Sequence, residues 1–235
     1  MKALVFNEFG DSTVLQYTEI PNPEIRPNEV LVRTKSIGLN FADIYRRKGN
    51  YHLAGEPPFI LGYEGAGIIE AVGKNVSQVQ VGDRVAFADV PFANAELVAV
   101  PSEKLIVLPE EISFDAAASI LLQGLTAHYL TNDSYKVKAN DSVVVHAASG
   151  GVGQNLVQIA KLCGGRVIAL TSTREKAKKA LEIGADITFT YDEDWIQSVM
   201  EFTDGKGADV VYDSVGSTLE DSFQATRIGG TVVFF

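Results

Sequence analysis

A glycine-rich turn is the first feature of the sequence that could do chemistry. Residues 147–153 read AASGGVG. Placed between a strand and a helix, such a turn points backbone N–H groups and the positive helix end at one spot, which suits a pyrophosphate. Glycines there let phosphates approach the backbone and let the helix pack closely on the strand. The residues predicted to contact a dinucleotide at this turn are Ser149, Gly150, Gly151, Val152 and Gly153.

The context of the turn carries more weight than its glycines. Ala148 stands where the strict G-x-G-x-x-G pattern has a glycine, so the motif alone is weak. A strand-like run, 143–145, precedes it, and an apolar helical face follows with Val152, Leu156, Ile159 and Cys163. The alternative is an ordinary strand–turn–helix without a nucleotide.

The end of the next strand-like run decides which nucleotide is expected. NAD-binding proteins usually carry an acid there for the ribose 2′-hydroxyl. In LTSTREKAKK the first acid is Glu175, which a capping box with Ser172 would occupy. The cations nearby, Arg174, Lys176 and Lys178, would instead suit the 2′-phosphate of NADP, at about 1.5–3 kcal/mol per charge-assisted bond. The alternative is that these cations only solvate an exposed helix.

The elements that must position this turn alternate regularly from residue 113 onward. A helix is predicted over 113–131, with Ser113 as its N-cap. Five apolar runs separated by helical segments follow: SVVVHA, RVIALT, ITFTY, DVVYDS and TVVFF. This alternation predicts an α/β fold with a doubly wound parallel sheet of the Rossmann type in residues 113–235. Because TVVFF ends inside a strand, we expect this domain to be truncated at its C-terminus.

Residues 1–112 have a different character. Short strand-like runs such as MKALVF, EVLVRTKSIGL, AGIIEAVG, DRVAFA and ELVAVP are separated by turn residues. A short helix is expected near FADIYRRKG. This part is predicted to be a separate β-rich domain of barrel type.

Composition and charge exclude several classes of protein. The 235 residues carry a formal net charge of −10, which argues against nucleic-acid and anionic-membrane binding. No stretch is long and apolar enough for a membrane span or signal peptide, so a cytoplasmic location is expected. The one cysteine, Cys163, excludes an internal disulfide and reads as a small core residue.

Taken together, these motifs resemble those of the zinc-free medium-chain dehydrogenase/reductases, most closely the zeta-crystallin-like NADPH:quinone oxidoreductases. The resemblance runs over essentially all 235 residues and rests on IGLNFADIYRRKGNY, LGYEGAGIIEAVG, VGDRVAF, LLQGLTAHYL, HAASGGVGQ, EIGAD and VVYDSVG. It implies a GroES-like substrate domain (1–112), a Rossmann NADP-binding domain (113–235), and a cleft between them that holds the nicotinamide.

The resemblance also implies roles for particular residues. Asn40 and Tyr45 would act at the reacting centre, with Tyr51 and Tyr63 as lesser candidates in the substrate cleft. The Lys176 side chain, together with Tyr191, would hold the 2′-phosphate. The remaining implied cofactor contacts are Thr126, Ser149, Gly150, Gly151, Val152, Gly153, Ser172, Arg174, Ser214, Val215 and Gly216.

A catalytic zinc is not expected. The zinc-dependent relatives carry a cysteine where this chain has Asn40 and a histidine where it has Tyr63. A catalytic zinc site needs three protein ligands. His146 ends a buried strand and His128 lies in a helix, so both are expected to be structural. His52 has no cysteine or acidic partner at ligand spacing.

Without a Lewis acid, an electron-poor acceptor is the expected substrate. The resemblance implies hydride transfer from NADPH to a quinone, with Asn40 and Tyr45 positioning the acceptor. Two alternatives stay open. One is NADPH-dependent reduction of alkenal or enone double bonds, and the other is a low-turnover NADPH-binding structural or regulatory protein. The full-length protein is expected to be a homodimer.

Overall fold

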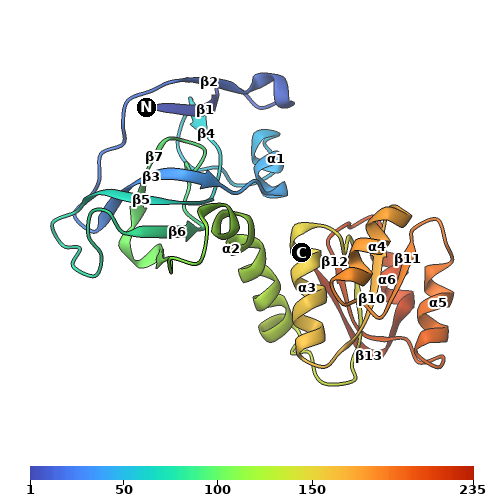
Figure 1. Ribbon diagram of the computed structural model, residues 1–235. Coiled ribbons are helices and arrows are strands. Elements are labelled where there is room, and N and C mark those ends of the chain that lie inside the picture. Colours follow the sequence, from blue (N-terminus) through green and yellow to red (C-terminus); the bar gives the residue numbers. More distant parts are fainter. The chain divides into compact units, whose positions relative to one another are not determined.

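The computed structural model describes residues 1–235, which form two compact units, Met1–Leu122 and Gln123–Phe235 (Figure 1). The boundary between them lies inside helix α2 (Phe114–Tyr129), past residue 113, where the sequence analysis started the second domain. Each unit has its own sheets and its own hydrophobic clusters.

The first unit is built of antiparallel strands. Its larger sheet has the order β7-β3-β5-β6-β8, and its smaller one the order β2-β1-β4. Val30 and Val32 alternate along β3 and meet Ile69, Val85 and Phe87 in the core. The strands are β1 (Lys2–Phe6), β2 (Gln16–Glu19), β3 (Glu29–Ile37), β4 (Phe59–Ile60), β5 (Glu64–Val72), β6 (Arg84–Ala88), β7 (Leu97–Pro101) and β8 (Leu105–Val107).

The helical pieces of this unit are short, and three strands were not predicted. Helix α1 spans Phe41–Arg47, and two 3-10 turns, η1 (Ser12–Val14) and η2 (Ser102–Lys104), join strands. The unpredicted strands are β2, β4 and β8. All four residues of β2 are exposed, and β4 and β8 are only two and three residues long, so none shows a readable alternation.

The second unit contains the predicted doubly wound sheet, which is confirmed. All its strand pairings are parallel, in the order β11-β10-β9-β12-β13. The chain runs outward from β9 to β11 and then returns to β12 on the other side, which makes the β9 edge the switch point. The strands are β9 (Ser142–Val145), β10 (Arg166–Thr171), β11 (Ile187–Thr190), β12 (Ala208–Asp213) and β13 (Thr226–Phe234).

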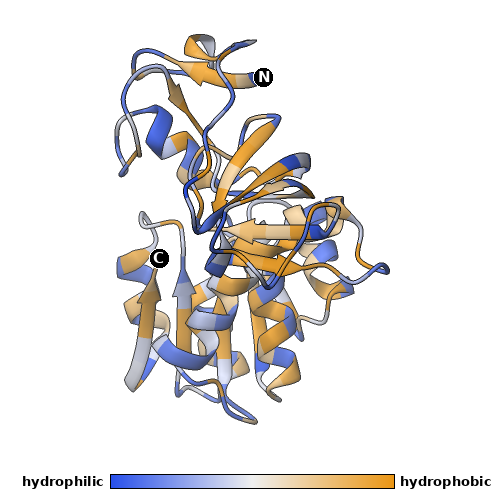
Figure 2. Ribbon diagram, turned by 90° about the vertical axis from the view of Figure 1, so that its left-hand side faces the viewer, coloured by the Kyte–Doolittle hydropathy of each residue, from blue (hydrophilic) through white to orange (hydrophobic).

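Helices cover both faces of this sheet, because strands such as β9 carry apolar side chains on both faces. Val143 and Val145 pack with Leu156 of α3, whereas Val144 faces the other way and packs with Trp195 of α5. Figure 1 shows α3 and α5 on opposite sides of the sheet, and Figure 2 shows strands made mostly of hydrophobic residues. The helices are α3 (Gly151–Leu162), α4 (Arg174–Glu182), α5 (Trp195–Phe202) and α6 (Leu219–Ala225), and a π-helical turn, η3 (Leu130–Ser134), follows α2. No helix of either unit has the length and apolarity needed to cross a bilayer.

Two helix starts test the predicted caps. The Ser113 hydroxyl accepts the Ala116 N–H at 3.1 Å, which confirms Ser113 as the cap of α2. The predicted capping box of Ser172 with Glu175 is wrong, because α4 starts one residue later. Its cap is Thr173, whose hydroxyl accepts the Lys176 N–H, and Glu175 pairs with Lys179 at 3.6 Å along the helix.

Two leucines of α3 provide a matched test of this packing. Leu156 is fully buried and Leu162 is 86% exposed. Leu156→Ala is expected to lower the free energy of unfolding of the second unit by about 2–5 kcal/mol, because it leaves a cavity. Leu162→Ala is expected to change it by less than about 0.5 kcal/mol.

The measurement is urea unfolding followed by tryptophan fluorescence. Trp195 is the one tryptophan of the chain and lies buried in the second unit, so its emission reports that unit. Equal effects of the two substitutions would contradict the packing described above.

Candidate functional site

The glycine turn lies between β9 and α3, at the carboxyl end of the central strand. Gly150 is the N-cap of α3, and no side chain caps the helix. The first helical bond runs from the Gln154 N–H to the Gly150 carbonyl at 2.9 Å. The N–H groups of residues 151–153 therefore have no partner within the helix and can bind an anion. Residues 149–153, predicted to contact a dinucleotide, all lie here.

Gly153 allows the helix to approach the turn. A Cβ atom at this position would lie 2.8 Å from the Ala148 Cα and would also overlap the Ala147 carbonyl oxygen. Ala147 itself adopts a left-handed conformation with φ of 46°. A larger residue at 153 would push α3 away from the turn and move its N–H groups.

A second glycine of the turn has a close neighbour that sequence reasoning missed. The Gln123 side chain, from α2, occupies the space that a Cβ atom on Gly151 would need. Gln123 therefore packs directly on the backbone of the predicted anion site. Thr126, another predicted cofactor contact, lies three residues further along the same helix.

The residues predicted to hold a 2′-phosphate lie in two places, beyond the end of β10 and beside the glycine turn. Lys176 donates a hydrogen bond from Nζ to the Ser172 hydroxyl at 2.9 Å, so these two side chains lie together beyond β10. Arg174 is exposed and pairs with Glu193 at 2.6 Å, which offsets part of its charge. Tyr191 instead directs its hydroxyl to the glycine turn, where it accepts the Ala147 N–H at 2.9 Å.

The loop after β12 is organised by Asp213, which sequence reasoning missed. Its Oδ1 accepts the N–H groups of Val215 and Gly216 at 2.8 and 3.1 Å, so the predicted residues 214–216 wrap around one carboxylate. Burial raises the pKa of Asp213, but the hydrogen bonds from Ser222 and from these two N–H groups bring it below its ordinary value. An acid at the end of an apolar strand was the available signal.

In the first unit, Asn40 is fixed by two carboxylates. Its backbone N–H donates to Asp43 Oδ2 at 3.0 Å, and its side-chain Nδ2 donates to Glu64 Oε2 at 3.0 Å. Glu64 is fully buried and also accepts the Leu122 N–H at 2.6 Å. Burial raises the pKa of Glu64 even though these hydrogen bonds lower it. Glu64 was missed, although an acid inside the apolar LGYEGAG run could have indicated it.

Tyr51 and Tyr63 both lie near the side chain of Arg46. The Arg46 guanidinium is 3.6 Å from the Tyr63 ring centroid and 5.1 Å from that of Tyr51. Arg46 also pairs with Asp43 at 3.2 Å, and both side chains are buried. Tyr45, on α1, is 46% exposed. The four predicted residues of the first unit thus gather on or beside α1.

The donor groups do not suit a metal ion. No three side chains among the histidines, cysteine, aspartates and glutamates of the chain gather as a metal site would require. At the two positions where zinc-dependent relatives have ligands, Asn40 donates to Glu64 and Tyr63 packs against the Arg46 cation.

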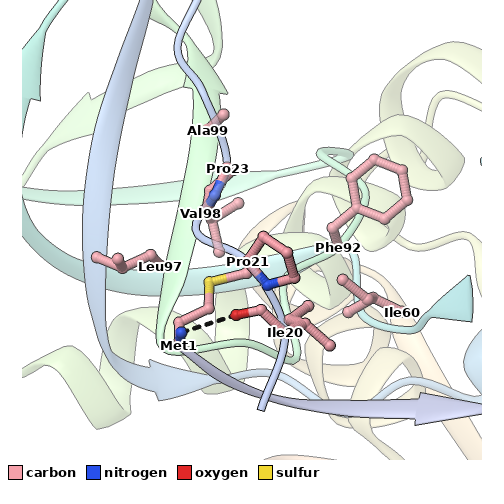
Figure 3. A pocket seen from close by; sticks show the side chains of 9 residues that line it. All are labelled: Met1, Ile20, Pro21, Pro23, Ile60, Phe92, Leu97, Val98 and Ala99. Atoms are coloured by element: carbon pink, nitrogen blue, oxygen red, sulfur yellow. Dashed lines mark hydrogen bonds between the residues drawn. The ribbon is translucent and has the colours of Figure 1, made fainter. Parts of the chain in front are cut away.

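One hollow of the first unit has a mostly apolar wall. It measures about 230 Å³ and lies beside the N-terminus (Figure 3). The amino group of Met1 donates to the Ile20 carbonyl at 2.9 Å and supplies the only ionisable group of the wall. The wall is otherwise apolar or backbone: Met1, Ile20, Pro21, Pro23, Ile60, Phe92, Leu97, Val98 and Ala99.

Family models match both units. Residues 26–137 match the alcohol dehydrogenase GroES-like domain, and residues 151–235 match the zinc-binding dehydrogenase model. The β-rich unit and the parallel-sheet unit therefore correspond to the two domains expected from the sequence.

Individual relatives match the whole chain. A quinone oxidoreductase of Pseudomonas aeruginosa is 44% identical, over all of this chain and 73% of the relative. A 2-haloacrylate reductase of a Burkholderia species is 39% identical, over 98% of this chain and 71% of the relative. The crystal structure of Escherichia coli quinone oxidoreductase complexed with NADPH has a TM-score of 0.94 at 34% identity, covering all of this chain and 80% of that one.

The buried histidine below the glycine turn makes stability depend on pH. Burial lowers the pKa of His146 below its ordinary 6.5, and Asp213 and Asp221 only partly offset this. The unfolded chain then takes up a proton at higher pH than the native one. The free energy of unfolding is therefore highest above the pKa that His146 has in the unfolded chain. It falls as the pH drops below about 6.5.

Unfolding followed by Trp195 fluorescence at about pH 7.5 and about pH 5.5 measures this dependence. The wild-type protein should lose stability over this interval, and His146→Gln should lose much less. His128→Gln, at an exposed histidine of α2, is the matched control. If His146→Gln retained the full wild-type loss, another group would be responsible.

Proposed function

The chain belongs to the medium-chain dehydrogenase/reductase family, among its quinone oxidoreductases, and from that premise we propose a zinc-independent transfer of hydride from NADPH to a quinone or a similar electron-poor acceptor. The observation that carries this proposal is the uncapped amino end of α3 above the glycine turn. It is the feature of the second unit that most directly suits the pyrophosphate of a dinucleotide.

The cofactor-binding residues of the proposal come from three strand ends of the second unit. The turn, residues 149–153, would hold the pyrophosphate through the backbone N–H groups of residues 151–153, and Lys176 with Ser172 would hold the 2′-phosphate. Residues 214–216, ordered by Asp213, would contact the rest of the dinucleotide, and Thr126 its ribose or nicotinamide. NADPH supplies the hydride when bound.

The first unit would supply hydrogen bonds rather than a Lewis acid. Glu64 fixes the orientation of the Asn40 amide, and Tyr45 presents an exposed hydroxyl on the neighbouring helix. Both groups can stabilise negative charge that develops on an acceptor oxygen. Quinones need less activation than simple ketones, which suits a site whose donors do not fit zinc.

A second candidate is reduction of an activated carbon–carbon double bond. The 39% identity to a 2-haloacrylate reductase supports it. The same donors would then stabilise charge on the oxygen conjugated with the double bond. Parallel assays with a quinone and with an enone separate the two candidates.

We also propose that the protein is a homodimer in the cytoplasm. Phe223, Ile228 and Phe234 of the second unit are exposed apolar side chains, which supports a contact with another surface. A single cysteine suits a reducing compartment.

The first test is a fluorescence titration with NADPH and with NADH. NADPH is expected to bind about 100-fold more tightly than NADH. Lys176→Ala should weaken NADPH binding about 10-fold or more and leave NADH binding unchanged. The matched control is Lys179→Ala, at an exposed lysine of the same helix that pairs with Glu175.

Addition of 1,4-benzoquinone should then oxidise the bound NADPH, at a rate that a zinc chelator does not alter. Equal affinity for the two nucleotides would contradict the 2′-phosphate site. Binding without oxidation of NADPH would contradict quinone reduction and favour the enone reaction.

The second test addresses the reacting centre. The double variant Asn40→Ala, Tyr45→Phe should lower kcat about 10²–10³-fold, because it removes hydrogen bonds to the developing charge. The KM for NADPH should change little. Tyr17→Phe, at an exposed tyrosine of β2, is the control for loss of a hydroxyl. An unchanged rate of reduction in the double variant would refute these roles.

A further inference from the structure

A continuous line of hydrogen bonds runs beneath the glycine turn. The Ala147 N–H donates to the Tyr191 hydroxyl at 2.9 Å, and this hydroxyl lies 3.3 Å from His146 Nδ1. On the other side of the ring, His146 Nε2 lies 3.1 Å from the Ser222 hydroxyl. Ser222 in turn donates to Asp213 Oδ2 at 2.7 Å. We call this set of four side chains the buried relay: Tyr191, His146, Ser222 and Asp213.

One assignment of donors and acceptors satisfies every hydrogen bond of the relay. Asp213 is ionised and can only accept, so the Ser222 hydroxyl donates to it. Ser222 Oγ then accepts from Nε2–H of His146, which leaves Nδ1 to accept from the Tyr191 hydroxyl. The Tyr191 oxygen accepts the Ala147 N–H. Every group is satisfied when His146 is neutral, which agrees with the lowered pKa that burial gives it.

The relay is sealed from solvent at its centre. His146 is 1% exposed, and Ser222 and Asp213 are fully buried. The His146 ring stacks with Tyr191 at 5.7 Å between centroids and meets Trp195 edge-on at 5.3 Å. Loss of one member would leave a buried polar group unpaired, which is unfavourable because water cannot replace the lost partner.

The two ends of the relay hold two different loops. At one end it reaches Ala147, the left-handed residue of the glycine turn after β9. At the other end, the second oxygen of Asp213 holds the N–H groups of Val215 and Gly216 after β12. These strands are neighbours in the sheet, and the His146 N–H donates to the Tyr212 carbonyl at 3.0 Å.

We propose that Tyr191, His146 and Ser222 are positioning residues that lock the glycine turn and the 214–216 loop in one arrangement and so preorganise the dinucleotide site. This inference rests on the proposed function, because it assigns the site to a dinucleotide. It also gives Tyr191 a role different from the 2′-phosphate contact expected from the sequence. The relay acts on the part of the site that NADPH and NADH share.

The binding test uses Tyr191→Phe, Ser222→Ala and the double variant. Each single variant should weaken both NADPH and NADH binding by the same factor, about 10-fold, with little change in kcat at saturation. The double variant should lose about 10-fold rather than about 100-fold, because both changes break one chain. The control is Tyr212→Phe, which removes another buried hydroxyl of the same sheet, one that donates to Leu130 and contacts the Tyr135 carbonyl.

Amide hydrogen exchange in the protein without nucleotide gives an independent readout. The Ala147 N–H should exchange faster in Tyr191→Phe and in Ser222→Ala than in wild type or Tyr212→Phe. The 15N shifts of the wild-type His146 ring should show a proton on Nε2 only. This readout does not need a cofactor, so it tests the relay even if the wild-type protein binds neither nucleotide and the proposed function fails.

Three results would overturn the proposal. Loss of NADPH affinity alone in Tyr191→Phe would mean a contact with the 2′-phosphate. Additive losses in the double variant would mean that the two residues act separately. Unchanged exchange of the Ala147 N–H in both single variants would mean that the relay does not hold the turn.

Discussion

The approach of α3 to the turn after β9 is the contact on which the candidate site depends. The helix can begin where it does only because residue 153 has no side chain to meet the Ala147 carbonyl and the Ala148 backbone. That approach directs the unpaired N–H groups of residues 151–153 over the carboxyl edge of the sheet. The sheet order, with its switch point beside β9, opens the same edge to a ligand.

Two buried carboxylates, Asp213 and Glu64, have pKa values shifted in opposite directions because their hydrogen-bond partners differ. Asp213 accepts hydrogen bonds from two backbone N–H groups and from the hydroxyls of Thr218 and Ser222, and its pKa lies below the ordinary value. Glu64 receives fewer donors and lies near Asp43, and its pKa is raised. Asp213 therefore serves as a fixed negative anchor for loops. Glu64 is poised nearer to protonation beside Asn40.

The family model that matches residues 151–235 is described as a zinc-binding dehydrogenase. The side chains of the first unit, in contrast, do not form a metal site. The first unit carries an amide at Asn40, a phenol at Tyr63 and a guanidinium at Arg46. Arg46 places a permanent charge against the Tyr63 ring and is neutralised by Asp43. Such a cluster can orient hydrogen-bond donors, which is the chemistry that an electron-poor acceptor needs.

The sequence by itself determined the features that depend on short-range pattern. The sequence alone predicted the alternation of strands and helices after residue 113, the glycine turn, the Ser113 cap and the side-chain types at positions 40 and 63. Each of these features is specified by residues within a short stretch of chain. The capping box of Ser172 failed at that same short range, since Thr173 offers an equivalent hydroxyl one residue later. Periodicity cannot choose between them.

Only the tertiary structure decided how distant residues meet. His146, Tyr191 and Ser222 come from three separate loops and helices, and no local pattern relates them. The same holds for Asn40 with Glu64 and for Gln123 with Gly151. Burial removes water as a partner, so each polar group must find another in the fold. Which group that is depends on strand order and helix packing, and these bring together residues that the chain separates.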